Sequence, residues 1–296
     1  MRERVPTANE LFFGAAPGDA GRLEALENIF FRSVGLPNGT WKTTAYRRLD
    51  DLNALVQPLL PTARPLDIMD VAVSSGVGTV EWIESLEQAG IDCRVTAGDA
   101  AVNAFLLSFG SRMRALVDPR GYPLQYEVAG LAIGAPLRKR DMLKYMLPAL
   151  FMRMASRLLR STLQNPQRAA LGQRWGVRWR ALQLVSPSLR NRKRIEVVED
   201  DILVNRSYSR CFHAVRAANI LNCGYFDDDT LVAMLTNLRD RLRVNGILIV
   251  CRTTKNENIN HASVFELSND GRLRVLARLN EGSEIESLAL ALKPAI

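Results

Sequence analysis

Short apolar segments and amphipathic segments alternate along most of the chain, and the clearest unit lies in its first third. Residues 66–73 form a near-continuous apolar stretch, as expected for a parallel strand covered on both faces. Small residues follow at Ser74–Gly78, and helical spacing appears at 80–86. A second strand is predicted at 93–97 and ends at Asp99. This order of strand, small-residue loop, helix, strand and acid has the form of a βαβ nucleotide-binding unit.

The alternation resumes after a long interruption and predicts a doubly wound α/β sheet. The later predicted elements are a strand at 195–198, a strand within 211–221, a helix at 230–243 and a strand at 247–251. A hairpin at 264–279 turns at Ser268–Gly271, near the end of the chain.

The remaining patterns predict helices and one more hairpin. Helical spacing appears at 22–33 and 46–60, and 100–110 is expected to form the helix after the second strand. Residues 114–128 alternate like a β-hairpin, and 141–163 are predicted to be helical. The predicted domains are an N-terminal helical cap (1–60), a first part of the core (61–110), a basic insertion of hairpin and helices (111–180) and a second part of the core (181–296).

Charge is concentrated in one segment. The net charge is +8, yet residues 138–194 alone contain fifteen Lys or Arg and one acid, so the rest of the chain has a net charge of −6. Arg153, Arg157 and Arg160 would share one face of a predicted helix. Such a face fits the surface of an anionic membrane, at about 1 kcal/mol per basic residue. A solvated rim beside an acceptor pocket is the ordinary alternative, and nucleic acid fits less well because no RNA-binding motif accompanies the charges.

The sequence gives no sign of a metal centre, a disulfide framework or a hydrolytic triad. His213 and His261 have no carboxylate or cysteine at metal or triad spacing. Met1–Val5 lacks the apolar region of a secretory signal, so we expect a cytoplasmic protein. The four cysteines are at no CxxC or zinc-ligand spacing: Cys93, Cys211, Cys223 and Cys251.

Three strand ends resemble the motifs of class I S-adenosylmethionine-dependent methyltransferases. They are Asp70–Gly78, which reads Asp-Val-Ala-Val-Ser-Ser-Gly-Val-Gly, then Asp99, and then Glu199–Ile202. The resemblance covers roughly 66–110 and 195–292 and implies a Rossmann-like sheet with a reversed C-terminal strand. The family's first motif usually has glycine where Ala72 and Ser74 stand here. Both replacements are small, so a close approach of the loop to a ligand is retained.

The resemblance implies that S-adenosylmethionine is the cofactor. Asp70 would orient the loop and help to hold the methionine ammonium, while backbone N–H groups of Ser74, Ser75 and Gly76 would hold its carboxylate. Asp99 would accept hydrogen bonds from both ribose hydroxyls, each worth about 1.5–3 kcal/mol. The ordinary alternatives are a plain strand-to-helix turn for the loop and helix caps for the two acids.

Further residues are assigned by the same resemblance. Asp201 would accept a hydrogen bond from the adenine amine and Ile202 would pack on the ring, with Asp200 as the adjacent alternative; Asn219 would border the sulfonium. In a rival alignment, Leu184–Pro187 becomes the second strand, which puts Gln183 or Val185 in the place of Asp99. Neither side chain can bind two hydroxyls as a carboxylate does.

The acceptor side is less defined. Tyr46, Asn222 and Tyr225 are the candidate substrate contacts, and no catalytic residue is specified, because methyl transfer depends mainly on positioning. The leading hypothesis is a methyltransferase acting on a small-molecule or lipid-like acceptor. The alternative is a noncatalytic module of the same fold that docks on membrane or nucleic acid through 138–194. A nicotinamide-dependent oxidoreductase is disfavoured because Ser74–Gly78 lacks the full G-x-G-x-x-G pattern.

Overall fold

The computed structural model describes residues 4–14, 20–36, 42, 45–134, 146, 150, 177–254 and 258–295. The chain forms two compact units: unit 1 is Met1–Thr44 with Asn103–Pro187, and unit 2 is Ala45–Val102 with Ser188–Ile296. This division differs from the predicted domains, because residues 45–60 belong to the unit that contains the large sheet.

Unit 2 is built on a seven-stranded sheet in the order β12-β11-β10-β9-β1-β2-β8. The strands β8, β2, β1, β9 and β10 are parallel, and β11 is antiparallel to both of its neighbours. The predicted Rossmann-like α/β fold is thereby confirmed. The reversal occurs at β11, and β12 runs again in the direction of the parallel strands. The strand bounds are β1 (Leu66–Val71), β2 (Cys93–Asp99), β8 (Ile195–Glu199), β9 (Phe212–Ala218), β10 (Leu242–Thr253), β11 (Asn260–Leu267) and β12 (Leu273–Leu279).

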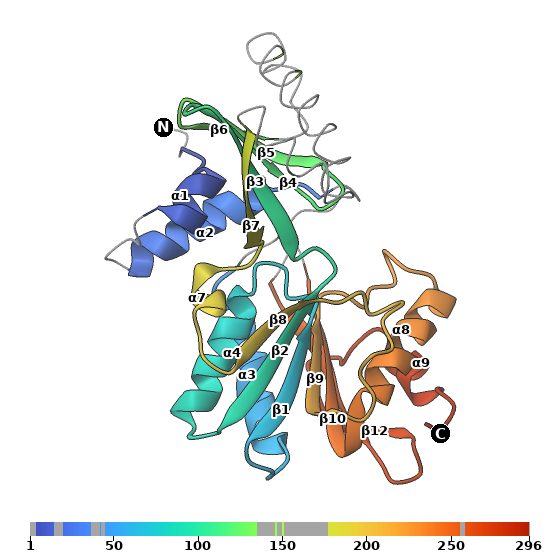
Figure 1. Ribbon diagram of the computed structural model, residues 1–296. Coiled ribbons are helices and arrows are strands. Elements are labelled where there is room, and N and C mark those ends of the chain that lie inside the picture. The colour runs from blue at the N-terminus through green and yellow to red at the C-terminus, as the bar shows by residue number, and fades with distance from the viewer. Residues whose placement is uncertain are drawn as a thin grey trace. The chain divides into compact units, whose positions relative to one another are not determined.

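Helices cover both faces of this sheet, as Figure 1 shows for unit 2. On one face lie α3 (Asp50–Val56), which continues into a 3-10 turn at Gln57–Leu59, and α4 (Val77–Gln88). On the other face lie α8 (Asp228–Asp240) and α9 (Glu286–Leu290). The short helix α7 (Pro187–Arg190) precedes β8.

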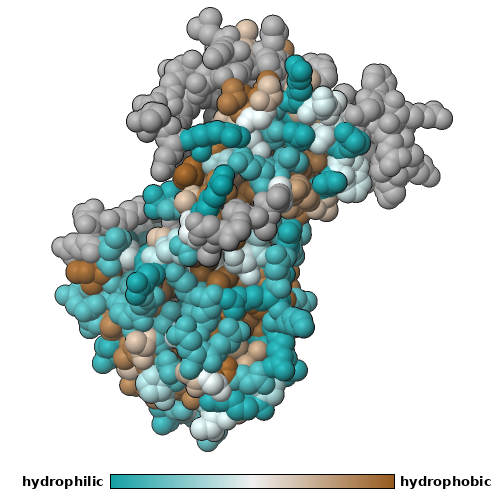
Figure 2. All heavy atoms as spheres, turned by 90° about the vertical axis from the view of Figure 1, so that its left-hand side faces the viewer, coloured by the Kyte–Doolittle hydropathy of each residue, from teal (hydrophilic) through white to brown (hydrophobic). Residues whose placement is uncertain are grey.

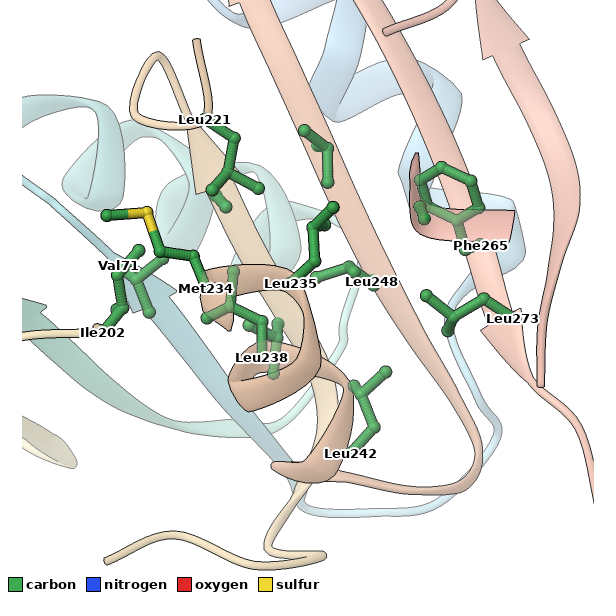
Figure 3. Close-up of a cluster of buried hydrophobic side chains, with 14 of the residues drawn as sticks. Val71, Ile202, Leu221, Met234, Leu235, Leu238, Leu242, Leu248, Phe265 and Leu273 are labelled. Atoms are coloured by element: carbon green, nitrogen blue, oxygen red, sulfur yellow. The ribbon is translucent and has the colours of Figure 1, made fainter. Parts of the chain in front are cut away.

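The apolar side of α8 explains why it packs on the sheet. Asp227 caps the helix by accepting a hydrogen bond from the Thr230 N–H at 2.9 Å. Leu231, Leu235 and Leu238 then recur at helical spacing, and all three are fully buried. They belong to one cluster with apolar residues of β9, β10 and β11. Figure 3 shows Leu235 and Leu238 of this cluster together with Leu248 of β10 and Phe265 of β11. This cluster is the main core on that face of unit 2.

Unit 1 contains α1 (Ala8–Phe13), α2 (Ala20–Ser33) and an antiparallel five-stranded sheet in the order β6-β5-β4-β3-β7. Phe12, Phe30 and Phe31 meet edge to face and join the two helices to one face of this sheet. The strand bounds are β3 (Asn103–Phe109), β4 (Met113–Val117), β5 (Pro123–Val128), β6 (Leu131–Gly134) and β7 (Val177–Gln183).

Two predicted helices are corrected by the structure, and a third lies outside the described residues. The expected helix at 100–110 is wrong, because Asn103–Phe109 forms β3 and places apolar side chains on both faces of its sheet. A continuous apolar run of that length does not distinguish strand from helix by periodicity. The helix expected at 230–243 ends at Asp240, and Leu242 begins β10. The helix predicted at 141–163 falls largely outside the described residues.

The described surface is mostly hydrophilic on the face shown in Figure 2, with apolar side chains in separate patches. Single exposed apolar side chains are ordinary on folded proteins. No described helix has the length and apolar composition of a membrane-crossing segment.

Candidate functional site

The topology of unit 2 defines one edge where a ligand would bind. From β1 the chain moves outward to β2 and β8, and then returns to the other side of β1 with β9 and β10. In doubly wound sheets, ligands bind outside the carboxyl ends of the strands at the point where the order reverses. Here that point lies between β1 and β9.

The loop that leaves β1 at this edge has an unusual backbone. Ala72, Ser74 and Gly76 all have positive φ, at 55°, 57° and 78°. Left-handed backbone costs a non-glycine residue roughly 1–2 kcal/mol. The loop therefore keeps a turn that glycine adopts without strain, although two of the three residues are not glycine.

Asp99 lies at the tip of β2 and faces this loop. Its Oδ2 accepts a hydrogen bond from the Ser74 N–H at 2.7 Å, and its Oδ1 accepts one from the Ala101 N–H at 2.9 Å. The residue is half-buried. The predicted proximity of Asp99 to the loop is observed; its binding of a ribose stays a prediction.

The loop itself is less open than expected. The Ser74 N–H donates to Asp99, the Gly76 N–H donates to the Val73 carbonyl at 2.7 Å, and Ser75 is buried. A Cβ built on Gly76 would lie 2.4 Å from Cδ2 of Leu189, a fully buried residue of α7. The space that this glycine leaves is thus filled by a side chain of the same chain.

Asp70 has a structural role that its motif did not indicate. Arg216 of β9 donates from Nε to Oδ1 at 3.0 Å and from Nη2 to Oδ2 at 2.6 Å, and the Thr79 hydroxyl donates to Oδ2 at 2.7 Å. Both charged side chains are almost fully buried, and the guanidinium lies 4.2 Å from the Trp82 ring centre. The expectation that Asp70 helps to hold a ligand's ammonium does not fit this geometry, because an arginine already occupies both oxygens.

Of the two aspartates after β8, one is buried and paired with an arginine, as Asp70 is, and the other is exposed. Asp200 forms a fully buried ion pair with Arg241, with bonds of 2.6 and 3.1 Å. Asp201 is exposed, and its Oδ1 accepts a hydrogen bond from the Leu203 N–H at 2.9 Å. Ile202 is buried in the core of unit 2 beside Met234, as Figure 3 shows. The predicted contact of Ile202 with adenine does not fit this position, whereas Asp201 remains accessible.

Asn219 fixes the carboxyl ends of neighbouring strands. It has a φ of 63°, its Oδ1 accepts a hydrogen bond from the Thr253 N–H at 2.7 Å, and its Nδ2 donates to Thr253 Oγ1 at 3.2 Å. Thr253 Oγ1 donates in turn to Asn260 Oδ1 at 2.7 Å, and Asn260 Nδ2 donates to the Arg48 carbonyl at 2.6 Å. These bonds join β9, β10 and β11 to the segment before α3.

The candidate acceptor contacts do not form a recognisable group among the described interactions. Asn222 is buried, and its Oδ1 accepts a hydrogen bond from the Gly224 N–H at 2.7 Å within a tight turn. Tyr225 is exposed in the same segment, and Tyr46 is half-buried before α3. Their substrate role stays a prediction.

Sequence reasoning missed Arg216 and Arg241, the buried partners of Asp70 and Asp200, and it also missed Arg48. Arg216 stands alone in the apolar run Ala214–Ala218, and a lone charge in a buried strand signals a buried partner. Burial lowers the pKa of Arg48, whose Nε has no hydrogen-bond partner in the part of the chain that the structure describes. Nearby, burial raises the pKa of the Cys251 thiol to about 12. Arg48 carried no sequence signal, because its surroundings come from distant segments.

No protein-family model and no curated protein matches the chain. Among solved structures, it is similar to an O-methyltransferase family protein from Burkholderia thailandensis, at 13% identity and a TM-score of 0.34, over 81% of this chain and 44% of that one. It is similar to 1,6-didemethyltoxoflavin-N1-methyltransferase from the same organism at 13% identity and a TM-score of 0.33, over 81% and 64%. It is also similar to the [4+2]-cyclase SpnF at 10% identity and a TM-score of 0.33, over 73% and 50%.

The chain thus spans less than two thirds of the length of each of these three proteins. The TM-scores are low, and the fold assignment therefore rests on the strand order and directions of unit 2.

The residues at this edge fit S-adenosylmethionine at one end only. Asp99 offers a half-buried carboxylate where a ribose would lie, and Asp201 offers a second acid on the neighbouring loop. At the methionine end, Asp70 is committed to Arg216 and Leu189 fills the space over Gly76. The arrangement can therefore bind a ligand's hydroxyl groups through acids at the ends of β2 and β8.

Proposed function

We propose that unit 2 binds S-adenosylmethionine and transfers its methyl group to a small-molecule or lipid-like acceptor. The observation that carries the proposal is Asp99, a half-buried carboxylate at the carboxyl end of β2 that faces the β1–α4 loop. In a parallel sheet of this order, an acid at that position is suited to bind both hydroxyls of a ribose. The carboxylate would exchange or share its backbone partners with those hydroxyls.

Methyl transfer from S-adenosylmethionine requires mainly that the protein position the two reactants. Bound S-adenosylmethionine would supply a methyl group already activated by its sulfonium, so the protein would orient the two reactants and exclude water. Asn219, Thr253 and Asn260 support this role, because their mutual bonds hold the carboxyl ends of β9 and β10 and the adjacent amino end of β11 in fixed register.

A noncatalytic binding module is the second candidate, and two observations favour it. Leu189 occupies the space over Gly76, and the Ser74 N–H is bonded to Asp99. In a loop that no longer binds a ligand, side chains of the same chain would fill the ligand's space and accept hydrogen bonds from the backbone N–H groups in this way. The two candidates therefore differ in whether the edge of unit 2 takes up an adenosyl ligand.

Calorimetric titration with S-adenosylmethionine and with its demethylated product tests the proposal. Asp99→Asn is expected to weaken both affinities at least tenfold, because two charge-assisted bonds of about 1.5–3 kcal/mol each are reduced to neutral ones. Asp92→Asn is the matched control, since Asp92 is an exposed acid just before the other end of β2. Thermal unfolding of each variant separates lost affinity from lost folding.

The outcomes distinguish the candidates. Binding that Asp99→Asn abolishes and Asp92→Asn leaves unchanged supports the proposal. A wild-type chain that gives no heat with either compound, but binds anionic vesicles or RNA in a salt-dependent way, supports the noncatalytic module. NADH binding, followed by its fluorescence, would instead support an oxidoreductase.

A further inference from the structure

Unit 1 has a cavity of its own, and all of the residues that line it belong to this unit. The cavity has a volume of about 510 Å³, and its lining consists of Asn9 of α1 and six residues of the sheet: Leu106, Ser108, Arg114, Arg178, Trp179 and Arg180. This volume lies within the range of small-ligand sites, roughly 300–1,000 Å³. It is much larger than a single inorganic ion needs.

The register of the strands explains why three arginines share this cavity. Ser108 of β3 is opposite Arg114 of β4 and also opposite Arg178 of β7, so the three residues form one row across the sheet. In the next row on the same face, Leu106 is opposite Arg180. Directly opposite residues in antiparallel strands point to the same face, about 4.5–5.5 Å apart between Cβ atoms. The arginines therefore gather by backbone pairing and not by loop flexibility.

One of these arginines is neutralised and the other two are not. Arg114 is paired with Glu127 of β5, which is buried, and that pair fixes the Arg114 guanidinium. Arg178 and Arg180 are exposed, and neither has an ion pair in the part of the chain that the structure describes. The Arg180 guanidinium lies 5.0 Å from the centre of the Phe13 ring, a contact that orients it without cancelling its charge.

Among the residues that the structure describes, the cavity lining therefore has two positive charges in excess, both on planar guanidinium groups. A guanidinium presents paired donors that match the oxygens of phosphate or carboxylate. Two guanidinium groups close together repel each other, and an anion bound between them removes that repulsion. A phosphate monoester has a charge of about −1.5 to −2 near neutral pH, which matches the excess.

We propose that this cavity is a binding site for a small organic phosphate monoester, held by Arg178 and Arg180 beside the fixed Arg114. The organic part would occupy the remaining volume against Leu106 and Asn9. The proposal does not depend on the activity proposed for unit 2. It also gives two arginines of the basic segment 138–194 a function other than contact with membrane or nucleic acid.

Calorimetric titration of the full chain tests the site, with phenyl phosphate as the probe and inorganic phosphate and benzyl alcohol as comparisons. Phenyl phosphate is expected to bind more tightly than inorganic phosphate, and benzyl alcohol is expected to give no heat. Arg178→Gln and Arg180→Gln are each expected to weaken phenyl phosphate binding at least tenfold. Arg120→Gln is the matched control, because Arg120 is exposed in the β4–β5 turn and does not line the cavity.

Several outcomes would overturn the proposal. They are an absence of heat with phenyl phosphate, equal affinities for phenyl and inorganic phosphate, and equal losses in the Arg120→Gln and Arg178→Gln variants. Vesicles of phosphatidylserine or a short RNA provide a final comparison. The proposal is wrong if vesicles or RNA bind less tightly to the Arg178→Gln and Arg180→Gln variants and saturating phenyl phosphate does not displace them from the wild-type chain. That result would show that the site serves a macromolecular anion.

Discussion

Replacing Asp70 by asparagine tests whether the first motif serves folding or ligand binding. The change removes the charge that balances Arg216, and both side chains are at most 4% exposed. Leaving one partner of a buried ion pair uncompensated costs about 3–5 kcal/mol. Typical domains are stable by about 5–15 kcal/mol, so Asp70→Asn should remove a large part of the stability of unit 2.

Urea unfolding followed by tryptophan fluorescence is the suitable assay, in a background where Trp41, Trp175 and Trp179 are replaced by phenylalanine. The remaining Trp82 is buried and lies against the Arg216 guanidinium. With a urea dependence of roughly 2 kcal/mol per M, the loss should lower the unfolding midpoint by about 1.5–2.5 M. Asp92→Asn removes only an exposed pair with Arg194 and should lower the stability by at most about 1 kcal/mol. The double variant Asp70→Asn/Arg216→Met removes both buried charges and should regain at least half of the loss.

Ligand titration completes the test. Where Asp70→Asn remains folded, its affinity for S-adenosylmethionine should equal that of the wild type, because both carboxylate oxygens face Arg216 and Thr79. The reasoning would be refuted by a variant with nearly unchanged stability and a tenfold weaker affinity. That result would make Asp70 a ligand-binding residue, as its motif suggests.

Three further changes have defined outcomes. Leu189→Ala should lower the free energy of unfolding in urea by about 2–5 kcal/mol, because the side chain is fully buried. The same change should not weaken S-adenosylmethionine binding. Weaker binding would show that Leu189 does not obstruct the ligand. Ala72→Gly should raise the free energy of unfolding by about 0.5–1 kcal/mol in thermal unfolding. The relief of left-handed backbone strain exceeds the stabilisation lost because glycine gives the unfolded chain more entropy. Ala54→Gly within α3 is the control and should lower the free energy of unfolding by about 1 kcal/mol. Burial raises the pKa of the Cys251 thiol to about 12, so a thiol reagent near pH 8 should label exposed Cys223 quickly and Cys251 only on unfolding; rapid labelling of both would contradict this. Because an unfolded thiol ionises near pH 8.5, this burial should also make the folded chain less stable as the pH rises from about 8.5 towards 12.

Local pattern was sufficient for the elements whose neighbours in space are also neighbours in sequence. The β1–α4–β2 unit follows from an apolar run, a small-residue turn and helical spacing within about 35 residues, and its acid Asp99 does face the loop. The same reasoning failed at 103–109, where both faces of a strand are apolar because two different clusters cover them. Periodicity carries no information there, since every position after Asn103 is buried or half-buried.

The site was predicted less well than the fold, because its chemistry depends on pairing over long distances in sequence. Asp70 and its partner Arg216 are 146 positions apart, and Asp200 and its partner Arg241 are 41 apart. A motif shows an acid at a strand end but does not show which cation it meets. The residue Leu189, which fills the space over Gly76, likewise comes from a helix that follows the whole of the unit 1 sheet.

The acids at the carboxyl edge of unit 2 fall into two kinds, and the difference determines which can serve a ligand. Asp70 and Asp200 are buried and bonded by arginines, so withdrawing either for a ligand would leave a buried guanidinium uncompensated at a cost of about 3–5 kcal/mol. Asp99 and Asp201 have access to solvent and accept hydrogen bonds from backbone N–H groups. When a ligand hydroxyl replaces a backbone N–H as the donor to one of these carboxylates, one charge-assisted hydrogen bond of about 1.5–3 kcal/mol is exchanged for another of the same kind. A ligand at this edge is therefore expected to bind through Asp99 and Asp201, and the two buried acids hold the strands that present them.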